Sequence, residues 1–189
     1  MNTYLVAGIA LVVVIVAIIA IYNSIIKNKN AIERAWAGVI TQERQKNQIL
    51  PAIEDVAEEY KTYEQGILKE IVSLRAGLSA LSVDEIDINK VTQVESRMSA
   101  ITDQLNVVVE AYPELKSAEL MQNLMREISE QQENIGAAIQ IFNRNVEIFN
   151  NGIETFPASI VNGILNREEK ITPFYDSVAA AGFEYKPQF

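Results

Sequence analysis

The sequence predicts an all-α protein in which an N-terminal transmembrane helix continues into an elongated up-and-down bundle of four antiparallel helices. Three observations predict this class. The chain opens with an uncharged apolar segment of membrane-spanning length. Apolar residues then recur every three or four positions through most of the chain. Only 8 Gly and 5 Pro occur in 189 residues, too few for a turn-rich β-protein.

The expected organisation has three parts. Residues 1–26 form a transmembrane anchor, residues 27–165 form the helical bundle, and residues 166–189 form an irregular C-terminal tail. No Gly/Ser-rich linker follows the anchor, so we expect its helix to run directly into the bundle.

Residues 4–22 carry the signal for the membrane anchor. All of them are uncharged, and at about 1.5 Å per residue they span roughly 28 Å, close to the ~30 Å thickness of the hydrocarbon layer. Tyr4 and Tyr22 lie at the two ends, where tyrosine rings favour the headgroup level. A buried core helix and a cleaved signal peptide are the alternatives. The first is rarely apolar on every face, and the second usually carries Lys or Arg before its core.

The charges beside the anchor predict its orientation. Lys27, Lys29 and Arg34 follow the apolar segment, whereas no Lys or Arg precedes it. The positive-inside rule then places the N-terminus outside and the body in the cytoplasm. A body on the outer side of the membrane is the alternative. The residues expected at the membrane interface are Tyr4, Tyr22, Lys27 and Lys29.

Helical spacing continues past the anchor, with Trp36 as a core residue of the first bundle helix. Residues 50–81 then carry a second apolar stripe, which includes the expected core residues Ile53 and Tyr60. Proline is tolerated in the first turn of a helix but disrupts its interior. We therefore expect a kink or a short break just before Pro51.

Ser82 and Glu85 match a capping box, Ser-x-x-Glu, which predicts the start of the third helix. Tyr112-Pro113 ends this helix, because the residue before proline avoids helical geometry. A fourth helix is expected over residues 117–153, and a short piece follows Phe156-Pro157. The expected core residues of these helices are Ile101, Ile135, Phe142 and Phe149.

The composition excludes several classes of function. The chain has no His and no Cys, which excludes Ser-His-Asp and Cys-His catalysis and any zinc or haem site built from His or Cys. A net charge of −9 makes nucleic acid an unsuitable partner. We therefore expect no catalytic residue, no cofactor and no bound metal. An enzyme that uses Asp, Glu, Ser, Lys or Tyr alone is the remaining catalytic alternative.

Two sets of polar residues are candidates for a structural or binding role. Asn143 and Asn150 are seven residues apart and so share a helix face, where they are candidate polar contacts that fix the register between helices. Surface asparagines are the alternative. An acidic run is expected to form a solvated face rather than a cation site. It consists of Glu54, Asp55, Glu58, Glu59 and Glu64.

Several short motifs give the chain a resemblance to the LemA family. In chain order they are Tyr22-Asn23, Asn30-x-x-Glu33-x-Ala35-Trp36, Glu110 to Lys116, Glu133-Asn134-Ile135, Phe142-Asn143, Phe149-Asn150 and Phe156-Pro157. Family members carry an acidic residue and paired basic residues before an Ile-Pro-Asn-Leu-Val segment, whereas this chain has Ile40-Thr41 through Gln45-Lys46 and then Leu50-Pro51-Ala52-Ile53. The resemblance implies a bacterial single-pass membrane protein with a four-helix-bundle domain and no established enzymatic activity.

The expected function is a membrane-anchored helical scaffold at the bacterial inner membrane. It would self-associate and organise partners or membrane without catalysis, because a rigid stalk and a bundle are present without a catalytic constellation. The expected partners are the lipid bilayer, further copies of the chain and a second membrane protein. An accessory or regulatory subunit of an envelope protease or transport complex is the alternative.

Overall fold

The computed structural model describes residues 2–59, 64–112 and 119–174, and every regular element within these ranges is helical. This confirms the all-α class. The elements are α1 (Asn2–Gln45), the 3-10 turn η1 (Lys46–Gln48), α2 (Leu50–Glu59), α3 (Glu64–Ser79), α4 (Ile88–Ala111), α6 (Glu119–Glu154), α7 (Ala158–Val161) and the π-helical turn η2 (Asn162–Asn166).

The chain divides into two compact units, each built from segments that are distant in sequence. The first unit comprises Met1–Ala35 and Ile141–Pro173, and it contains most of α1, the end of α6, α7 and η2. The second unit comprises Trp36–Gln140 and Phe174–Phe189. It contains the end of α1, all of α2, α3 and α4, and the start of α6.

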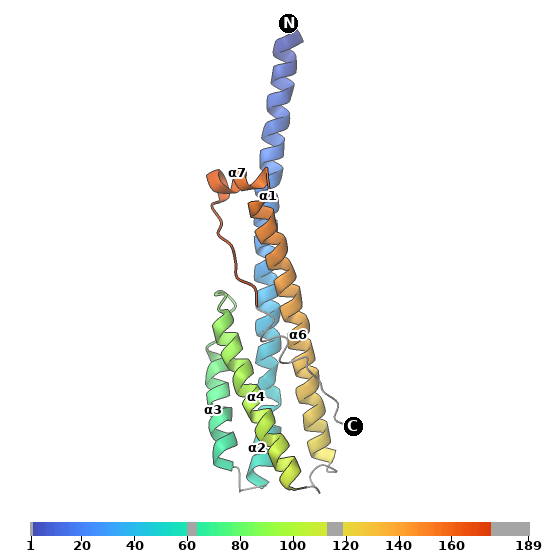
Figure 1. The fold of residues 1–189 in the computed structure, drawn as a ribbon, viewed down its shortest axis with the longest axis vertical. Coiled ribbons are helices and arrows are strands. Elements are labelled where there is room, and N and C mark those ends of the chain that lie inside the picture. Colours follow the sequence, from blue (N-terminus) through green and yellow to red (C-terminus); the bar gives the residue numbers. More distant parts are fainter. Residues whose placement is uncertain (1, 60–63, 113–118, 175–189) are drawn as a thin grey trace. The chain divides into compact units, whose positions relative to one another are not determined.

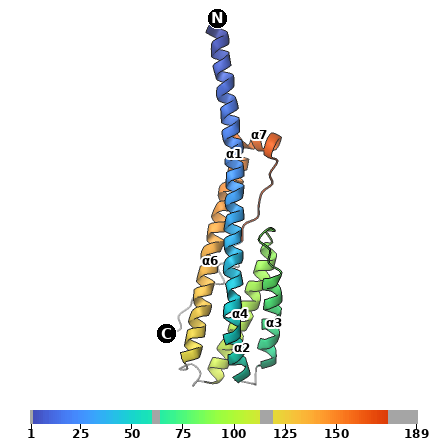
Figure 2. The same cartoon turned by 180° about the vertical axis from the view of Figure 1, so that it is seen from behind.

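Within the second unit, the helices alternate in direction. The end of α1 and α2 run one way, α3 returns, α4 runs the first way again, and the start of α6 returns beside it (Figure 1; Figure 2). The predicted antiparallel arrangement is therefore confirmed. Apolar stripes fill the space between these helices. Their fully buried members include Val39, Ile40, Leu50, Ile53, Ile67, Ile71, Leu74, Leu78, Val91, Ile101 and Leu105.

The helix expected over residues 50–81 is in fact two helices. Helices α2 and α3 pack against each other, which two halves of one straight helix cannot do. Between the buried Ala57 and Ile67 the only large apolar side chains are tyrosines, so this gap in the stripe accompanies the reversal. Pro51 lies in the first turn of α2, just after η1, which agrees with the predicted short break.

The capping-box prediction was wrong. Helix α4 begins at Ile88, and its N-cap is Asp87, whose carboxylate accepts a hydrogen bond from the Lys90 backbone N–H at 3.1 Å. The Ser82 hydroxyl instead accepts from the backbone N–H of Asp84. Residues 82–87 are not helical, so Ser82 and Glu85 do not form the box, and the Glu85 carboxylate pairs with the Lys90 ammonium. The end of the helix at Ala111 agrees with the prediction.

Within the first unit, the end of α6 runs antiparallel to α1 (Figure 1; Figure 2). The two helices approach closely at Gly152, where an added Cβ would lie 3.4 Å from the Asn28 side-chain nitrogen. Helix α7 then lies crosswise to α1. Residues 3–20 of α1 are exposed throughout, so this apolar segment is not the core helix of the described structure.

Candidate functional site

The second unit contains a buried group of charges that we call the charge cluster, formed by Glu43, Lys46 and Glu95. The Lys46 ammonium donates to Glu43 Oε2 at 2.8 Å and to Glu95 Oε1 at 2.7 Å. The Glu43 and Lys46 side chains have no exposed surface, and Glu95 retains 20%. The cluster joins the last turn of α1 and η1 to the first half of α4.

The charges in the cluster do not balance when every group is ionised. Burial raises the pKa of Glu43 well above its ordinary value of 4.5, and this effect outweighs the opposing attraction of Lys46. Glu95 raises the pKa further, because it repels a second negative charge and interacts favourably with the protonated carboxyl. Among the described residues, Glu43 Oε1 has no hydrogen-bond partner. A proton on Glu43 would leave one ammonium facing one carboxylate.

Glu43→Gln should remove a pH dependence of stability. Because the pKa of Glu43 is higher in the folded chain, the folded state binds more protons than the unfolded state above about pH 4.5. The stabilisation of the folded state that results is complete below that pH, and it is lost as pH rises through the folded-state pKa of Glu43. Glutamine keeps an oxygen that accepts from Lys46 but does not titrate. Denaturant unfolding between pH 4.5 and 8 should therefore show a flatter profile for the variant, and an identical slope would assign the effect to another group.

Two side chains of α1 bind the backbone that follows α3. The Trp36 indole donates to the Ser82 carbonyl at 3.0 Å, and the Arg44 guanidinium donates to the Leu81 carbonyl at 2.9 Å. Leu81 and Ser82 lie just beyond the end of α3, where a carbonyl has no helical partner, so these two donors pair backbone groups outside the helices. The Trp36 ring also stacks on Phe174, with centroids 6.2 Å apart and an interplanar angle of 24°.

The structure gives positions to most of the residues expected in the core. Trp36, Ile53, Ile101, Ile135, Phe142 and Phe149 are all buried. Tyr60 lies outside the described residues. Of the acidic run, Glu54 pairs with Arg75 of α3 at 2.9 Å, whereas Asp55 and Glu58 are exposed. The side chains of Glu59 and Glu64 lie outside the described part of the chain.

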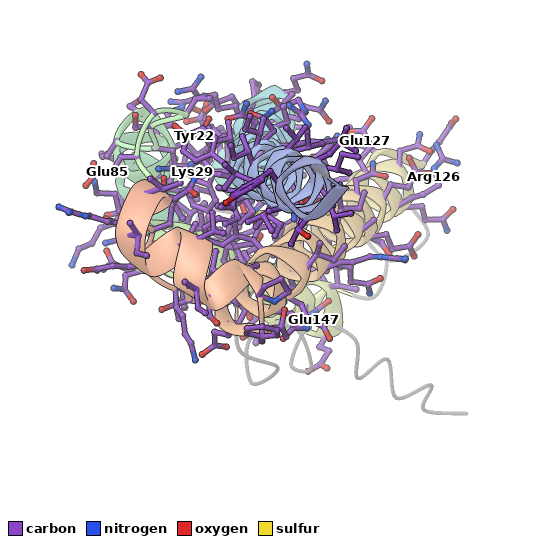
Figure 3. All side chains as sticks on the ribbon, turned by 90° about the horizontal axis from the view of Figure 1, so that it is seen from above. Tyr22, Lys29, Glu85, Arg126, Glu127 and Glu147 are labelled. Atoms are coloured by element: carbon purple, nitrogen blue, oxygen red, sulfur yellow. The ribbon has the colours of Figure 1, made fainter. Side chains whose placement is uncertain are left out.

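The residues expected at the membrane interface all lie on α1. Tyr4, Tyr22 and Lys27 are exposed, and Lys29 pairs with Glu168 at 2.8 Å. Figure 3 looks down on this segment and labels Tyr22 and Lys29 on the same side of α1. Seven residues separate them, which is about two helical turns.

Asparagines of α6 and η2 use their side-chain amides to pair with backbone groups of the segment that follows η2. Asn150 donates to the Ile171 carbonyl at 2.9 Å and accepts from the Ile171 N–H at 3.1 Å. Its partner is thus the segment after η2 rather than another helix. Asn162 binds the carbonyl and N–H of Glu168 in the same two-way manner. Asn143 is half-buried on α6.

Glu43 and Lys46 are not among the site residues predicted from the sequence. A signal was present. The spacing of three or four that passes through Trp36 and Ile40 reaches Glu43, Lys46 and then Leu50. The two charged residues therefore occupy inward positions of the same stripe.

A shallow hollow of about 230 Å³ lies between α3 and α4, below the roughly 300–1,000 Å³ of typical ligand pockets. Its lining includes Ser73, Gly77, Lys90 and Arg97. Within the described ranges, no three side chains of His, Cys, Asp or Glu gather to hold a metal ion. The Glu43 and Lys46 side chains have no exposed surface, so neither group is open to a ligand in this conformation.

These features define a class, the helical proteins that have one candidate N-terminal membrane span ahead of a helical body. The apolar helix has the length and composition of either an anchor or a signal sequence. The chain belongs to the LemA family, whose family model matches residues 35–187. It is similar to Protein LemA of Metamycoplasma hominis, with 32% identity over 134 residues, which cover 71% of this chain and 60% of that protein.

Proposed function

We propose that the chain is a membrane-anchored scaffold that self-associates and organises partners or membrane at the bacterial envelope. The observation that carries the proposal is the uncovered apolar segment of α1, where residues 3–20 are all exposed. Apolar surface of this extent is unfavourable in water, at about 25 cal/mol per Å², and favours insertion into lipid.

The segment is proposed to be a retained anchor rather than a cleaved signal. No Ala-x-Ala site directly follows its apolar core, where the chain continues as Tyr22-Asn23-Ser24-Ile25-Ile26. Ile25, only three residues beyond Tyr22, is already buried at 2% exposure. The helix that begins in the apolar segment thus enters the packed part of the first unit almost at once.

A role without catalysis is supported by the chemistry of the side chains. The chain has no His and no Cys. The groups with the most unusual environment, Glu43 and Lys46, are enclosed and paired with each other. A scaffold needs a stable body and an interface. The packed helices form the stable body.

Small residues in the anchor supply a candidate interface. Ala7, Ala10 and Ala17 lie within about 80° of one another on a helical wheel, and small side chains let membrane helices approach closely. Confinement to a membrane raises the effective concentration of the copies, so weak contacts suffice.

The full-length chain should therefore be a homo-oligomer in mild detergent, whereas residues 27–189 should be monomeric or weakly associated. Light scattering with the detergent mass subtracted measures both. Ala10→Leu with Ala17→Leu should shift the full-length chain toward monomer, because the bulkier side chains block close approach. Val12→Leu, on the opposite helix face, is the matched control. A monomeric full-length chain would refute self-association.

We also propose that the body faces the cytoplasm. Lys27, Lys29 and Arg34 follow the anchor, and no Lys or Arg precedes it. Protease added to spheroplasts should therefore leave the body intact, and should digest it after lysis. Digestion before lysis, with a cytoplasmic marker protein still protected, would place the body on the outer side.

A further inference from the structure

The segment that ends the helical part of the first unit exposes an unusual amount of apolar surface. Four of its side chains form what we call the apolar face, with 80% of Phe156, 55% of Ile160, 64% of Ile164 and 51% of Leu165 exposed. Ile160 and Ile164 are four residues apart, about one helical turn, and so point the same way. Val161, between them in sequence, is buried at 6%. Asn162 hydrogen-bonds to the backbone of Glu168, so the segment has a partly polar inner side and an apolar outer side.

The charge around the apolar face differs from that of the whole chain. The chain carries a net charge of −9, yet Phe156–Arg167 contains no Asp and no Glu. The exposed Arg167 closes the segment. Of the acidic residues that flank the segment, Glu154 pairs with Lys170 and Glu168 pairs with Lys29, whereas Glu169 is exposed. Nothing in the segment itself would repel an anionic or zwitterionic lipid surface.

Contacts within the first unit place the apolar face beside the end of the proposed membrane anchor. Gly152 lies against Asn28, and Glu168 pairs with Lys29, so the segment lies near residues 28–29 of α1. These residues are roughly 10 Å beyond Tyr22 along the helix. The headgroup layer on each side of a bilayer is about 5–8 Å thick, so the face is at or near this layer.

The orientation also suits a membrane surface. Helix α7 lies crosswise to α1 (Figure 1; Figure 2). If α1 spans the bilayer, an element crosswise to it runs along the plane of the membrane. Amphipathic elements in this orientation bury their apolar side roughly 5–10 Å into the boundary between headgroups and acyl chains.

We propose that the apolar face docks on the lipid bilayer that holds the anchor and forms a second membrane contact of the same unit. A second copy of the chain is a poorer occupant. Four partly exposed side chains present on the order of a few hundred Å², below the ~800 Å² per partner of a standard interface. The inference rests on the proposed anchor but is independent of self-association.

The chain has no cysteine, so one introduced cysteine can be labelled at a chosen site. Full-length Ile164→Cys carries an environment-sensitive fluorophore and is reconstituted in phosphatidylcholine–phosphatidylglycerol vesicles. Spin-labelled lipids quench it from a shallow or a deep position. Ile141→Cys is the matched control, because Ile141 is equally apolar, 59% exposed and about 20 Å from the end of α6. Val12→Cys reports the anchor, and Ile160→Cys repeats the test on the same face.

We expect shallow quenchers to reduce the signal at Ile164 and Ile160 several-fold more than at Ile141, and deep quenchers to act mainly at Val12. Equal quenching at Ile164 and Ile141 would overturn the proposal. A blue-shifted but unquenched label at Ile164 would also overturn it, and would assign the face to a protein contact. If Val12 is not quenched, the anchor itself is wrong. If Val12 alone is quenched, the anchor stands and only the second contact fails.

Discussion

Replacing Lys46 with alanine is expected to lower the free energy of unfolding by about 3–5 kcal/mol, a large share of the roughly 5–15 kcal/mol that stabilises a typical domain. The ammonium is fully buried and is hydrogen-bonded to Glu43 and Glu95 at 2.8 and 2.7 Å. Without it, the fully buried Glu43 carboxyl and the largely buried Glu95 carboxyl lose the partner that they share. Denaturant unfolding of the full-length chain, followed by the fluorescence of its one tryptophan, measures the loss.

Two further variants separate the missing charge from a general loss of packing. Lys90→Ala removes an ion-paired lysine that is 39% exposed, and it should change stability far less. Lys46→Met combined with Glu43→Leu replaces a buried pair with apolar groups, which is often neutral, and it should recover part of the loss. A Lys46→Ala effect no larger than that of Lys90→Ala would show that the charge cluster does not stabilise the fold.

Trp36→Ala should be at least as damaging. Removing a buried tryptophan side chain typically lowers stability by about 3–5 kcal/mol through lost transfer energy and an unfilled cavity. Trp36 is 1% exposed and stacks on Phe174. Its indole also donates to the Ser82 carbonyl at 3.0 Å in a partly buried hydrogen bond, and the loss of such a bond adds about 0.5–1.5 kcal/mol. Circular dichroism at 222 nm follows unfolding, since the variant lacks the fluorescent reporter.

Trp36→Phe and Glu58→Ala complete this series. Phenylalanine keeps an aromatic ring but cannot donate to Ser82. The free energy of unfolding of Trp36→Phe should therefore lie between those of Trp36→Ala and the natural chain. Glu58 is exposed on α2, and its replacement should change stability by less than about 0.5 kcal/mol. If Trp36→Phe is as stable as the natural chain, the hydrogen bond contributes nothing. A larger effect at Glu58 would mean that the acidic run is not a passive face.

Helical periodicity was sufficient to predict the fold class and most of the inward positions. The stripe of α4, from Val91 to Val108, is buried as its spacing predicts, because a helix that packs along its length must repeat its apolar side every 3.6 residues. The start of α4 was not predictable in this way. Two competing caps lay within six residues, and Ser82–Glu85 matched a motif while Asp87 formed the hydrogen bond.

The candidate site was harder to predict than the fold. The positions of Glu43 and Lys46 on the stripe of α1 were visible in the sequence, but a charged residue at an inward position is rarely buried unless paired. The partner, Glu95, lies 49 residues further along the chain. Nothing local to either segment links them, so only the packing of α4 against the end of α1 reveals the cluster. The same holds for Asn150, whose partner Ile171 follows a reversal of the chain.

The separation between Lys46 and Glu95 also has a consequence for the order of events during synthesis. Ribosomes add roughly 5–20 residues per second, so Glu95 is made on the order of 2–10 seconds after Lys46. Until then Glu43 and Lys46 have only each other, and the nascent helix keeps two hydrated charges on the side that will later be enclosed. The end of α1 is therefore less prone to premature apolar association while the rest of its bundle is still missing.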